Sequence, residues 1–379
     1  MKILINASNL RKGGGIQVAE SLISELHRYP QHQFVVVYSD ALSNSVDQMS
    51  PFDNIVSIKY NLPSNVLLNL TGRNSFLDNL VEEKRIDTVL TVFGPSRWRP
   101  KVTHVCGFAR AQMVLESSPY WGVIGYKVRI RYFFRKRLLK MAFDRSAKVL
   151  WSESSYISDL LKKTYPSKRV YTVTNNYNQV FDEPEKWDRT ITIPHNEGLT
   201  FLTISANYPH KNLSIIIPTV HYLKSKYPEL KFRFVLTIRE CEFPKLDESM
   251  KGFVEFLGPV TIGQCPYLYE QCDVMLLPSL LECFSANYAE AMRMGKPILT
   301  TNLDFAKALC GDAAIYYGAI DPRDLGEAIY LLSKDKNLRK HLVENGYKQL
   351  SQFDSYETRA KKLIEIVENE FSIQRHEES

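Results

Sequence analysis

Short apolar runs, each followed by polar or helix-forming sequence, recur along the whole chain. Such runs, when helical patterns separate them, predict buried strands of a parallel sheet. The predicted strands are residues 2–6, 34–38, 88–93, 102–108, 148–151 and 170–173, and then 199–205, 232–238, 254–257, 274–277, 297–300 and 314–317. Two successive series of alternating strands and helices predict an α/β fold made of two Rossmann-like domains.

The length of the chain, 379 residues, is too great for one ordinary core and fits two domains. We place these domains at residues 1–178 and 198–354, because the segment between them is rich in charge, proline and asparagine. A hydrophobic content of 44% supports buried cores. The sequence shows neither a signal-peptide pattern nor the roughly 20 consecutive apolar residues of a membrane-spanning helix. We therefore expect a cytoplasmic protein, at most peripheral on the inner face of the plasma membrane.

Residues 273–300 form the most informative segment. Residues 274–277 are wholly apolar and predict a buried strand that ends in a loop. Ser285 is a candidate N-cap for a helix that begins near Ala286, and Gly295 ends that helix before the next strand. The segment is therefore one strand-loop-helix-strand unit.

Two glutamates eight residues apart lie in this unit. Glu282 falls in the loop beyond the carboxyl end of a strand, where open α/β sheets bind ligands. Glu290 falls in the second turn of the helix, and its side chain leans toward the helix N-terminus, whose N–H groups favour a phosphate. A carboxylate is also a bidentate acceptor for paired sugar hydroxyls. The spacing alone occurs often by chance, and a solvated helix face is the alternative interpretation.

Two further elements fit a phosphate. Gly14 and Gly15 lie in a loop of three glycines before an apolar helical pattern, and consecutive glycines let backbone wrap an anion. A flexible surface loop is the alternative, and no dinucleotide or nucleoside triphosphate signature is present. Lys211 follows the strand at 199–205 and precedes a helical run, which would place its ammonium beside a diphosphate. A solvated charge is the alternative for this lysine.

Neither a cofactor nor a metal is predicted. No D-x-D sequence occurs, and the six cysteines are scattered without C-x-x-C pairs or histidine partners at metal spacing. Thiols in this pattern are typical of core residues in a reducing cytoplasm. The charge of a leaving diphosphate would then be met by Lys211, backbone N–H groups and the helix dipole.

Residues 121–148 are the most basic part of the chain. They carry nine lysines and arginines against one acid, Asp144. Read as a helix, the segment places Lys127 and Arg131 on one face and Ile130 and Phe134 on a neighbouring face, as in helices that lie on anionic membranes. A helix packed on its own domain with a solvated basic face is equally consistent. Nucleic acid is not expected, because the net charge of +6 is modest and no recognition motif accompanies it.

The context of the two glutamates resembles glycosyltransferase family 4, whose members are retaining enzymes of the GT-B fold. Their motif has the form PS-x-x-E-G-F-G-x-x-x-x-E-A-M-x-x-G-x-P. Cys283 and Ser285 replace its two glycines, which narrows the space where backbone approaches the sugar. Nine positions of this chain match it: Pro278, Ser279, Glu282, Phe284, Glu290, Ala291, Met292, Gly295 and Pro297.

The resemblance implies two Rossmann-like domains that face each other across a cleft, with a last helix, at about 355–373, that packs back on the first domain. It implies that Glu282 contacts the transferred sugar, that the backbone from Phe284 to Ala286 lies against it, and that Glu290 holds the ribose hydroxyls. The donor would be a UDP- or GDP-linked sugar. The acceptor would be a glycan or a polyprenyl-linked oligosaccharide in surface polysaccharide synthesis.

Two more positions follow from the same resemblance. Lys211 and Asn212 match a diphosphate-binding element of the family, but Ala206 or Asn207 stands where the family has an arginine. Family members often place a histidine in the loop after a strand like 102–108, which makes His104 a catalytic candidate. A half-buried structural histidine is the alternative, because Gly107 fits the loop position equally well.

Two other functions stay open at this stage. A nucleotide-sugar epimerase has the same fold and needs no acceptor. A nucleotide-sugar-binding subunit without turnover is consistent with the altered glycines and the missing arginine.

Overall fold

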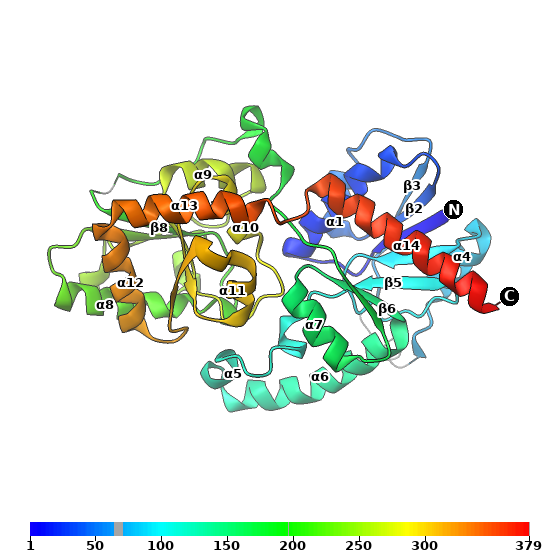
Figure 1. Ribbon diagram of the computed structural model, residues 1–379, viewed down its shortest axis with the longest axis horizontal. Helices are drawn as coiled ribbons and strands as arrows, with labels where there is room; N and C mark the ends of the chain where they lie inside the picture. Colours follow the sequence, from blue (N-terminus) through cyan, green and yellow to red (C-terminus); the bar gives the residue numbers. More distant parts are fainter. Residues whose placement is uncertain (64–70, 196, 379) are drawn as a thin grey trace. The chain divides into compact units, whose positions relative to one another are not determined.

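The computed structural model describes residues 1–63, 71–195 and 197–378, and these divide into two compact units. Unit 1 comprises Met1–Val114, Tyr126–Asn175 and Asp354–Ser379, and unit 2 comprises Leu115–Gly125 and Asn176–Phe353. The chain therefore passes between the units four times. Figure 1 shows the elements of both units, coloured along the sequence.

Unit 1 is built on a parallel sheet of seven described strands, in the order β3-β2-β1-β4-β5-β6-β7. Its inner strands are almost entirely buried, as expected of a sheet covered by helices on both faces. The strands are β1 (Lys2–Ala7), β2 (Gln33–Tyr38), β3 (Ile55–Lys59), β4 (Thr88–Thr91), β5 (Thr103–Gly107), β6 (Val149–Ser152) and β7 (Arg169–Thr172).

The helices of unit 1 include the last helix of the chain. This helix, α14, contacts α1, β4 and β5 (Figure 1), and it buries Ala360, Leu363, Ile364 and Val367 in the core of the unit. The core of unit 1 is thus completed by residues about 350 positions away from its first strand. The described helices are α1 (Gly14–Glu25), α2 (Ser43–Val46), α4 (Ser75–Lys84), α6 (Tyr126–Ser146), α7 (Ser155–Thr164) and α14 (Tyr356–Glu378).

Unit 2 is built on a second parallel sheet, in the order β10-β9-β8-β11-β12-β13. The described strands are β8 (Leu199–Thr203), β9 (Phe232–Leu236), β10 (Val254–Phe256), β11 (Val274–Leu277), β12 (Ile298–Thr301) and β13 (Ala314–Tyr317). The described helices are α5 (Tyr120–Val123), α8 (Ile216–Lys226), α9 (Cys265–Gln271), α10 (Ala286–Arg293), α11 (Asp304–Cys310), α12 (Pro322–Lys334) and α13 (Lys336–Leu350). From β8 the chain adds β9 and β10 on one side of the sheet, and from β11 it adds β12 and β13 on the other side. The strand order therefore reverses between β8 and β11, and ligands are expected at the carboxyl ends of these two strands.

All twelve predicted strands are confirmed, and β11 and β13 have the predicted bounds. The sequence interpretation missed β3, an edge strand whose residues are mostly exposed and therefore give no apolar run. It also missed that residues 115–125 join unit 2, and that the boundary after β7 falls between Asn175 and Asn176.

Candidate functional site in unit 2

The unit formed by β11, a loop, α10 and β12 has the predicted local structure. Ser285 occupies the N-cap position of α10 with extended backbone, but its hydroxyl donates to Asn287 Oδ1 at 3.2 Å and accepts no hydrogen bond from a backbone N–H of the described helix. Gly295 follows the helix with φ +62°. A Cβ at this position would lie 2.5 Å from the hydroxyl oxygen of Tyr347. Glycine is therefore required there both for the left-handed backbone and for space.

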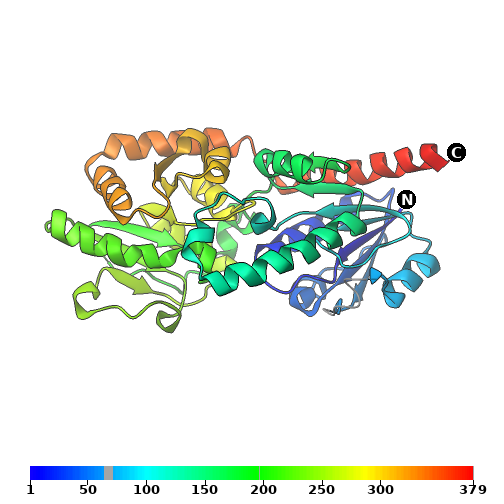
Figure 2. The ribbon, with the colours of Figure 1, turned by 90° about the horizontal axis from the view of Figure 1, so that it is seen from below.

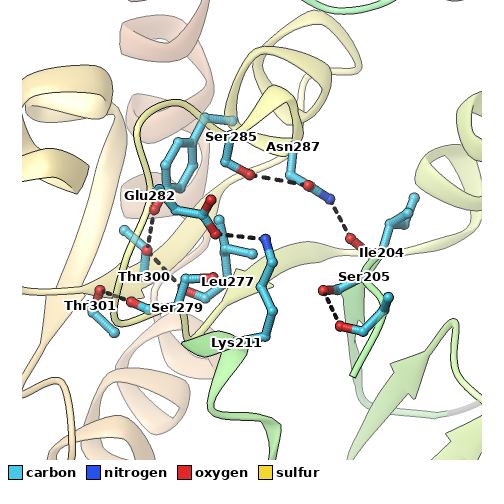
Figure 3. A network of polar contacts seen from close by, with 12 residues as sticks. Ile204, Ser205, Lys211, Leu277, Ser279, Glu282, Ser285, Asn287, Thr300 and Thr301 are labelled. Atoms are coloured by element: carbon cyan, nitrogen blue, oxygen red, sulfur yellow. Dashed lines mark hydrogen bonds and ion pairs between the residues drawn. The ribbon is translucent and has the colours of Figure 1, made fainter. Parts of the chain in front are cut away.

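Glu282 and Lys211 form an ion pair beyond the carboxyl ends of two neighbouring strands. Lys211 Nζ lies 2.6 Å from Glu282 Oε1, and the two side chains are 13% and 11% exposed (Figure 3). Lys211 ends the short 3-10 helix Pro209–Lys211 after β8, and Glu282 lies in the loop after β11. These residues meet because β8 and β11 pair in parallel, which brings both following loops to one edge of the sheet.

The left-handed backbone of Asn212 fixes the position of Lys211. Asn212 has φ +51°, and its side-chain amide donates to the carbonyl of Ala319 at 3.2 Å. Asparagine tolerates this conformation better than most residues. The turn therefore directs Lys211 toward Glu282 before the chain enters α8.

Glu290 is buried at the second turn of α10. Burial raises the pKa of its carboxyl to about 7, although a hydrogen bond from the Tyr269 hydroxyl, at 3.1 Å, and the charge of Lys211 both act to lower it. Lys211 is thus close enough to act on Glu290 as well as on Glu282. Lys211 thus interacts with two acidic side chains, Glu282 and Glu290. Its ammonium is the cation that a negatively charged ligand at this site would also contact.

Hydrogen bonds hold the loops around Lys211 and Glu282 (Figure 3). The Asn287 amide donates to the carbonyl of Ile204 at 2.9 Å and so joins α10 to the end of β8. Thr301 Oγ1 donates to the carbonyl of Ser279 at 2.8 Å, and Thr300 Oγ1 donates to that of Leu277 at the same distance. These contacts order the backbone that leads to Glu282.

Sequence reasoning missed Tyr269, Asn287 and His210. Tyr269 lies in α9 outside any motif, so no sequence pattern links it to Glu290. Asn287 follows the candidate N-cap directly, and a polar side chain at that position was the available signal. Burial lowers the pKa of His210, and the negative charge of Glu282 acts in the opposite direction and raises it. His210 also ties the loops together, because its carbonyl accepts from Leu280 N at 2.7 Å.

Other predicted residues occupy different surroundings. Asn207 is exposed, and its amide donates to the carbonyl of Glu242. The Phe284 ring packs edge-on against Phe353 at 5.4 Å between centroids. Ala286 is the first residue of α10, where backbone N–H groups lack helical partners.

Gly14 and Gly15 belong to unit 1 and begin α1. The preceding Gly13 has φ +84°, which requires glycine, whereas a Cβ on Gly14 would meet no described atom within 4 Å. At Gly15 a Cβ would lie 3.3 Å from the Phe93 ring. The geometry of unit 1 therefore leaves the backbone accessible at Gly14, and anion binding at this turn stays a prediction.

His104 lies inside β5 and not in the loop after it, where the family resemblance places a catalytic histidine. The residue is 6% exposed. Its Nδ1 contacts the carbonyl of Ser146, so Nδ1 carries the proton, and Nε2 accepts from Thr91 Oγ1 at 2.8 Å. Burial lowers the pKa of this ring to about 4. His104 is a neutral structural residue that joins β5, β4 and the end of α6, and we correct its assignment accordingly.

Within the described ranges, no group of three or more His, Cys, Asp or Glu side chains could hold a metal ion. In the same part of the chain, no helix is long and apolar enough to cross a membrane.

Comparison with known proteins relates this chain to glycosyltransferases, by sequence and by fold. Residues 185–349 match the family described as glycosyl transferases group 1. The structure of HepE from Anabaena in complex with UDP-glucose matches with a TM-score of 0.67 at 15% identity, over 97% of this chain and 100% of that chain. The fold is therefore that of the GT-B glycosyltransferases.

Within the chain, residues 185–349 carry the sequence match to the group 1 glycosyltransferases. An uncharacterized glycosyltransferase of Methanocaldococcus jannaschii is 26% identical over 62% of this chain and 62% of that protein. The N,N'-diacetylbacillosaminyl-diphospho-undecaprenol alpha-1,3-N-acetylgalactosaminyltransferase of Campylobacter jejuni is 28% identical over 61% of this chain and 62% of that protein. The alignments thus span about three fifths of each relative. The resemblance drawn from residues 278–297 is confirmed for family and fold.

Proposed function

We propose that the chain transfers a sugar, with retention and without a metal ion, from a nucleotide-sugar donor to a hydroxyl of a glycan or lipid-linked acceptor. The observation that carries this proposal is the largely buried Lys211–Glu282 pair beside Glu290 at the carboxyl edge of β8 and β11. A cation, two acids and a helix N-terminus are the groups that a diphosphate, a sugar and a ribose require.

In the proposed reaction Lys211 and the N-terminus of α10 bind the diphosphate, and Glu282 positions the sugar. The bond between the anomeric carbon and the phosphate oxygen breaks as the acceptor oxygen bonds to the same carbon on the same face. The acceptor proton passes to the departing phosphate. Lys211 and the helix dipole stabilise the charge that develops on that phosphate, because both are fixed in a largely dry site.

Glu290 would hold the ribose hydroxyls as a carboxylate. Its pKa of about 7 means that the free protein carries this group in both protonation states near neutral pH. Donor binding that uses the carboxylate would therefore release protons, and the apparent affinity would depend on pH in this range.

The relatives support the kinds of substrate proposed. The Campylobacter jejuni protein is named for transfer to a diphospho-undecaprenol substrate, and the HepE structure contains UDP-glucose. A lipid-linked acceptor would require the enzyme to work in the cytoplasm at the inner face of the plasma membrane.

A thermal-shift screen of UDP, GDP and their sugar conjugates would test the donor, since a ligand of the folded state raises the melting temperature. Glu290→Ala should mainly weaken nucleotide binding, and Glu282→Ala should mainly lower turnover. Full activity in both variants would contradict the assignment. Activity lost in EDTA and restored by magnesium would contradict the metal-independent reaction.

A nucleotide-sugar-binding subunit is the second candidate, because Cys283 is buried where the family motif has glycine and thereby narrows the loop. This candidate predicts donor-induced stabilisation with no transfer to any acceptor. An epimerase would instead release altered nucleotide sugar when no acceptor is present.

A further inference from the structure

The N-terminal part of α6 is the most exposed apolar segment of the described chain. Between residues 126 and 138 no side chain is fully buried, and the only partly buried ones are Tyr132 and Lys136. The exposed large side chains of the helix are Tyr126, Val128, Ile130, Phe133, Phe134, Leu138 and Met141, with exposed fractions from 39% to 70%. Large apolar side chains gathered on one helix indicate an interaction surface.

The C-terminal part of α6 holds the helix on unit 1. Leu139, Ala142, Phe143 and Ser146 are its buried residues. The Phe143 ring packs against Phe108 at 5.1 Å, and the carbonyl of Ser146 is bound by His104. The rest of the helix therefore extends from a fixed base. Figure 2 shows α6 as a long helix along one side of the sheet strands of unit 1.

Five of these seven side chains share the face opposite this base. Positions 126, 130, 133, 134 and 141 follow a spacing of four, three, one and seven residues, which places them on one side of an α-helix. The buried positions 139, 142, 143 and 146 fall on the other side. We call the five residues Tyr126, Ile130, Phe133, Phe134 and Met141 the outward face.

Cations surround the outward face. Lys127 and Arg131 flank it on one side, Arg129 and Lys140 flank it on the other, and the Arg137 guanidinium lies 5.9 Å from the centre of the Phe133 ring. No acidic residue occurs in the sequence from 117 to 143. Like charges this close repel one another, so a negatively charged surface would relieve the repulsion.

We propose that α6 docks on an anionic lipid bilayer, with the outward face entering the interface and the flanking cations contacting lipid phosphates. Aromatic and aliphatic side chains in the headgroup region, with Lys and Arg at the sides, are the pattern of helices that lie in a membrane surface. A second protein copy would meet the same cations and be repelled. Nucleic acid would satisfy the cations and leave Ile130, Phe134 and Met141 exposed. The docking is independent of the proposed reaction in unit 2.

Vesicle sedimentation of the whole protein, without nucleotide sugar, tests this proposal. We expect binding to vesicles of equal parts phosphatidylcholine and phosphatidylglycerol, no binding to pure phosphatidylcholine, and weaker binding at high salt. Lys127→Ala, Arg131→Ala and Arg137→Ala together should lower the partition coefficient on the order of a hundredfold, at about fivefold for each cation. The matched control removes three exposed lysines of the same unit, Lys162, Lys163 and Lys361, and should retain binding.

The apolar contribution needs its own variants. Phe133→Ser with Phe134→Ser should weaken binding at unchanged charge, whereas the same change at the exposed Phe52 and Val56 should not. A Phe134→Trp variant should bind and show added quenching by brominated lipid in comparison with the wild type. This variant keeps the proposal testable if the serine variant does not fold, as judged by circular dichroism.

Three results would overturn the proposal. One is equal binding of the wild type and the α6 variants, and another is Phe134→Trp emission that brominated lipid does not quench. The third is a preference for another partner: either self-association without lipid that Phe133→Ser with Phe134→Ser abolishes, or tighter binding to single-stranded RNA than to anionic vesicles. Failure of glycosyl transfer would leave all of these measurements unchanged, so the two proposals fail separately.

Discussion

The replacement of Glu290 by Gln should make unit 2 more stable at alkaline pH while it weakens nucleotide binding. The raised pKa means that the folded state holds a proton that the unfolded state releases between pH 4.5 and about 7. The stability of the wild type therefore falls as pH rises through this window. The difference between 4.5 and about 7, at about 1.4 kcal/mol for each unit, corresponds to a loss on the order of 3 kcal/mol.

Glutamine has the shape of glutamate and no charge to desolvate, and its amide oxygen can still accept from Tyr269. Denaturant unfolding should show little difference between variant and wild type near about pH 4, and a gain approaching 3 kcal/mol for the variant near about pH 8. Glu229→Gln, at an exposed position of the same unit, is the matched control and should change neither value. Glu153, a buried acid of unit 1 with a pKa of about 7, is present in all three proteins and cancels in the comparison.

Nucleotide binding should move in the opposite direction. The loss of a charged acceptor for ribose hydroxyls should raise Kd by about tenfold to a hundredfold, measured by titration calorimetry with the nucleotide that the thermal-shift screen selects. The wild type should bind more tightly as pH rises toward 8, and the variant should lose this dependence. A variant that is no more stable near pH 8, or that binds nucleotide as the wild type does, would refute the reasoning.

Three further outcomes follow from the contacts described. Lys211→Ala leaves Glu282 buried without its cation and should lower the free energy of unfolding, measured with denaturant, by about 3 kcal/mol. Removing Glu282 as well should recover part of this loss. Additive effects of the two substitutions would contradict the pairing. His104→Ala should cost about 1–3 kcal/mol. In the wild type, the free energy of unfolding should rise with pH between about 4 and 6.5, because the buried ring stays neutral while the ring of the unfolded chain is still protonated. His104→Ala should abolish this rise. An unchanged pH profile of stability would count against a buried neutral His104. Gly295→Ala should cost about 1–2 kcal/mol, and Tyr347→Phe should relieve part of it by removing the hydroxyl that the new Cβ meets; equal cost in both backgrounds would exclude that contact.

The sequence was sufficient for elements that are buried throughout. The apolar run of β11 predicted its bounds, because a parallel strand covered on both faces has no polar alternation. The edge strand β3 could not be found in this way, since exposed residues are under no pressure to be apolar. The excursion of residues 115–125 into unit 2 was also beyond the sequence, because it depends on contacts such as that from Ser118 Oγ to the carbonyl of Leu280 at 2.6 Å.

For the candidate site, the sequence indicated which residues belong to the site, but it did not show which of them contact one another. Glu282, Glu290 and Lys211 were identified from local motifs. That Lys211 pairs with Glu282 follows from the pairing of β8 with β11, which no local pattern shows. The raised pKa of Glu290 depends on burial, which the fold creates and which outweighs the lowering effects of Tyr269 and Lys211. His104 shows the same limit, because the strand register decided between a loop position and a core position.

The discontinuity of unit 1 has a consequence for how the protein is made. Its sheet is translated early, but the apolar face that covers α1, β4 and β5 belongs to α14. During synthesis the core of unit 1 therefore stays incomplete and partly exposed to solvent until unit 2 and residues 354–379 have left the ribosome. A nascent chain that stalls after α13 would hold one finished unit and one open unit, and the open unit would be the natural substrate for a chaperone or a protease.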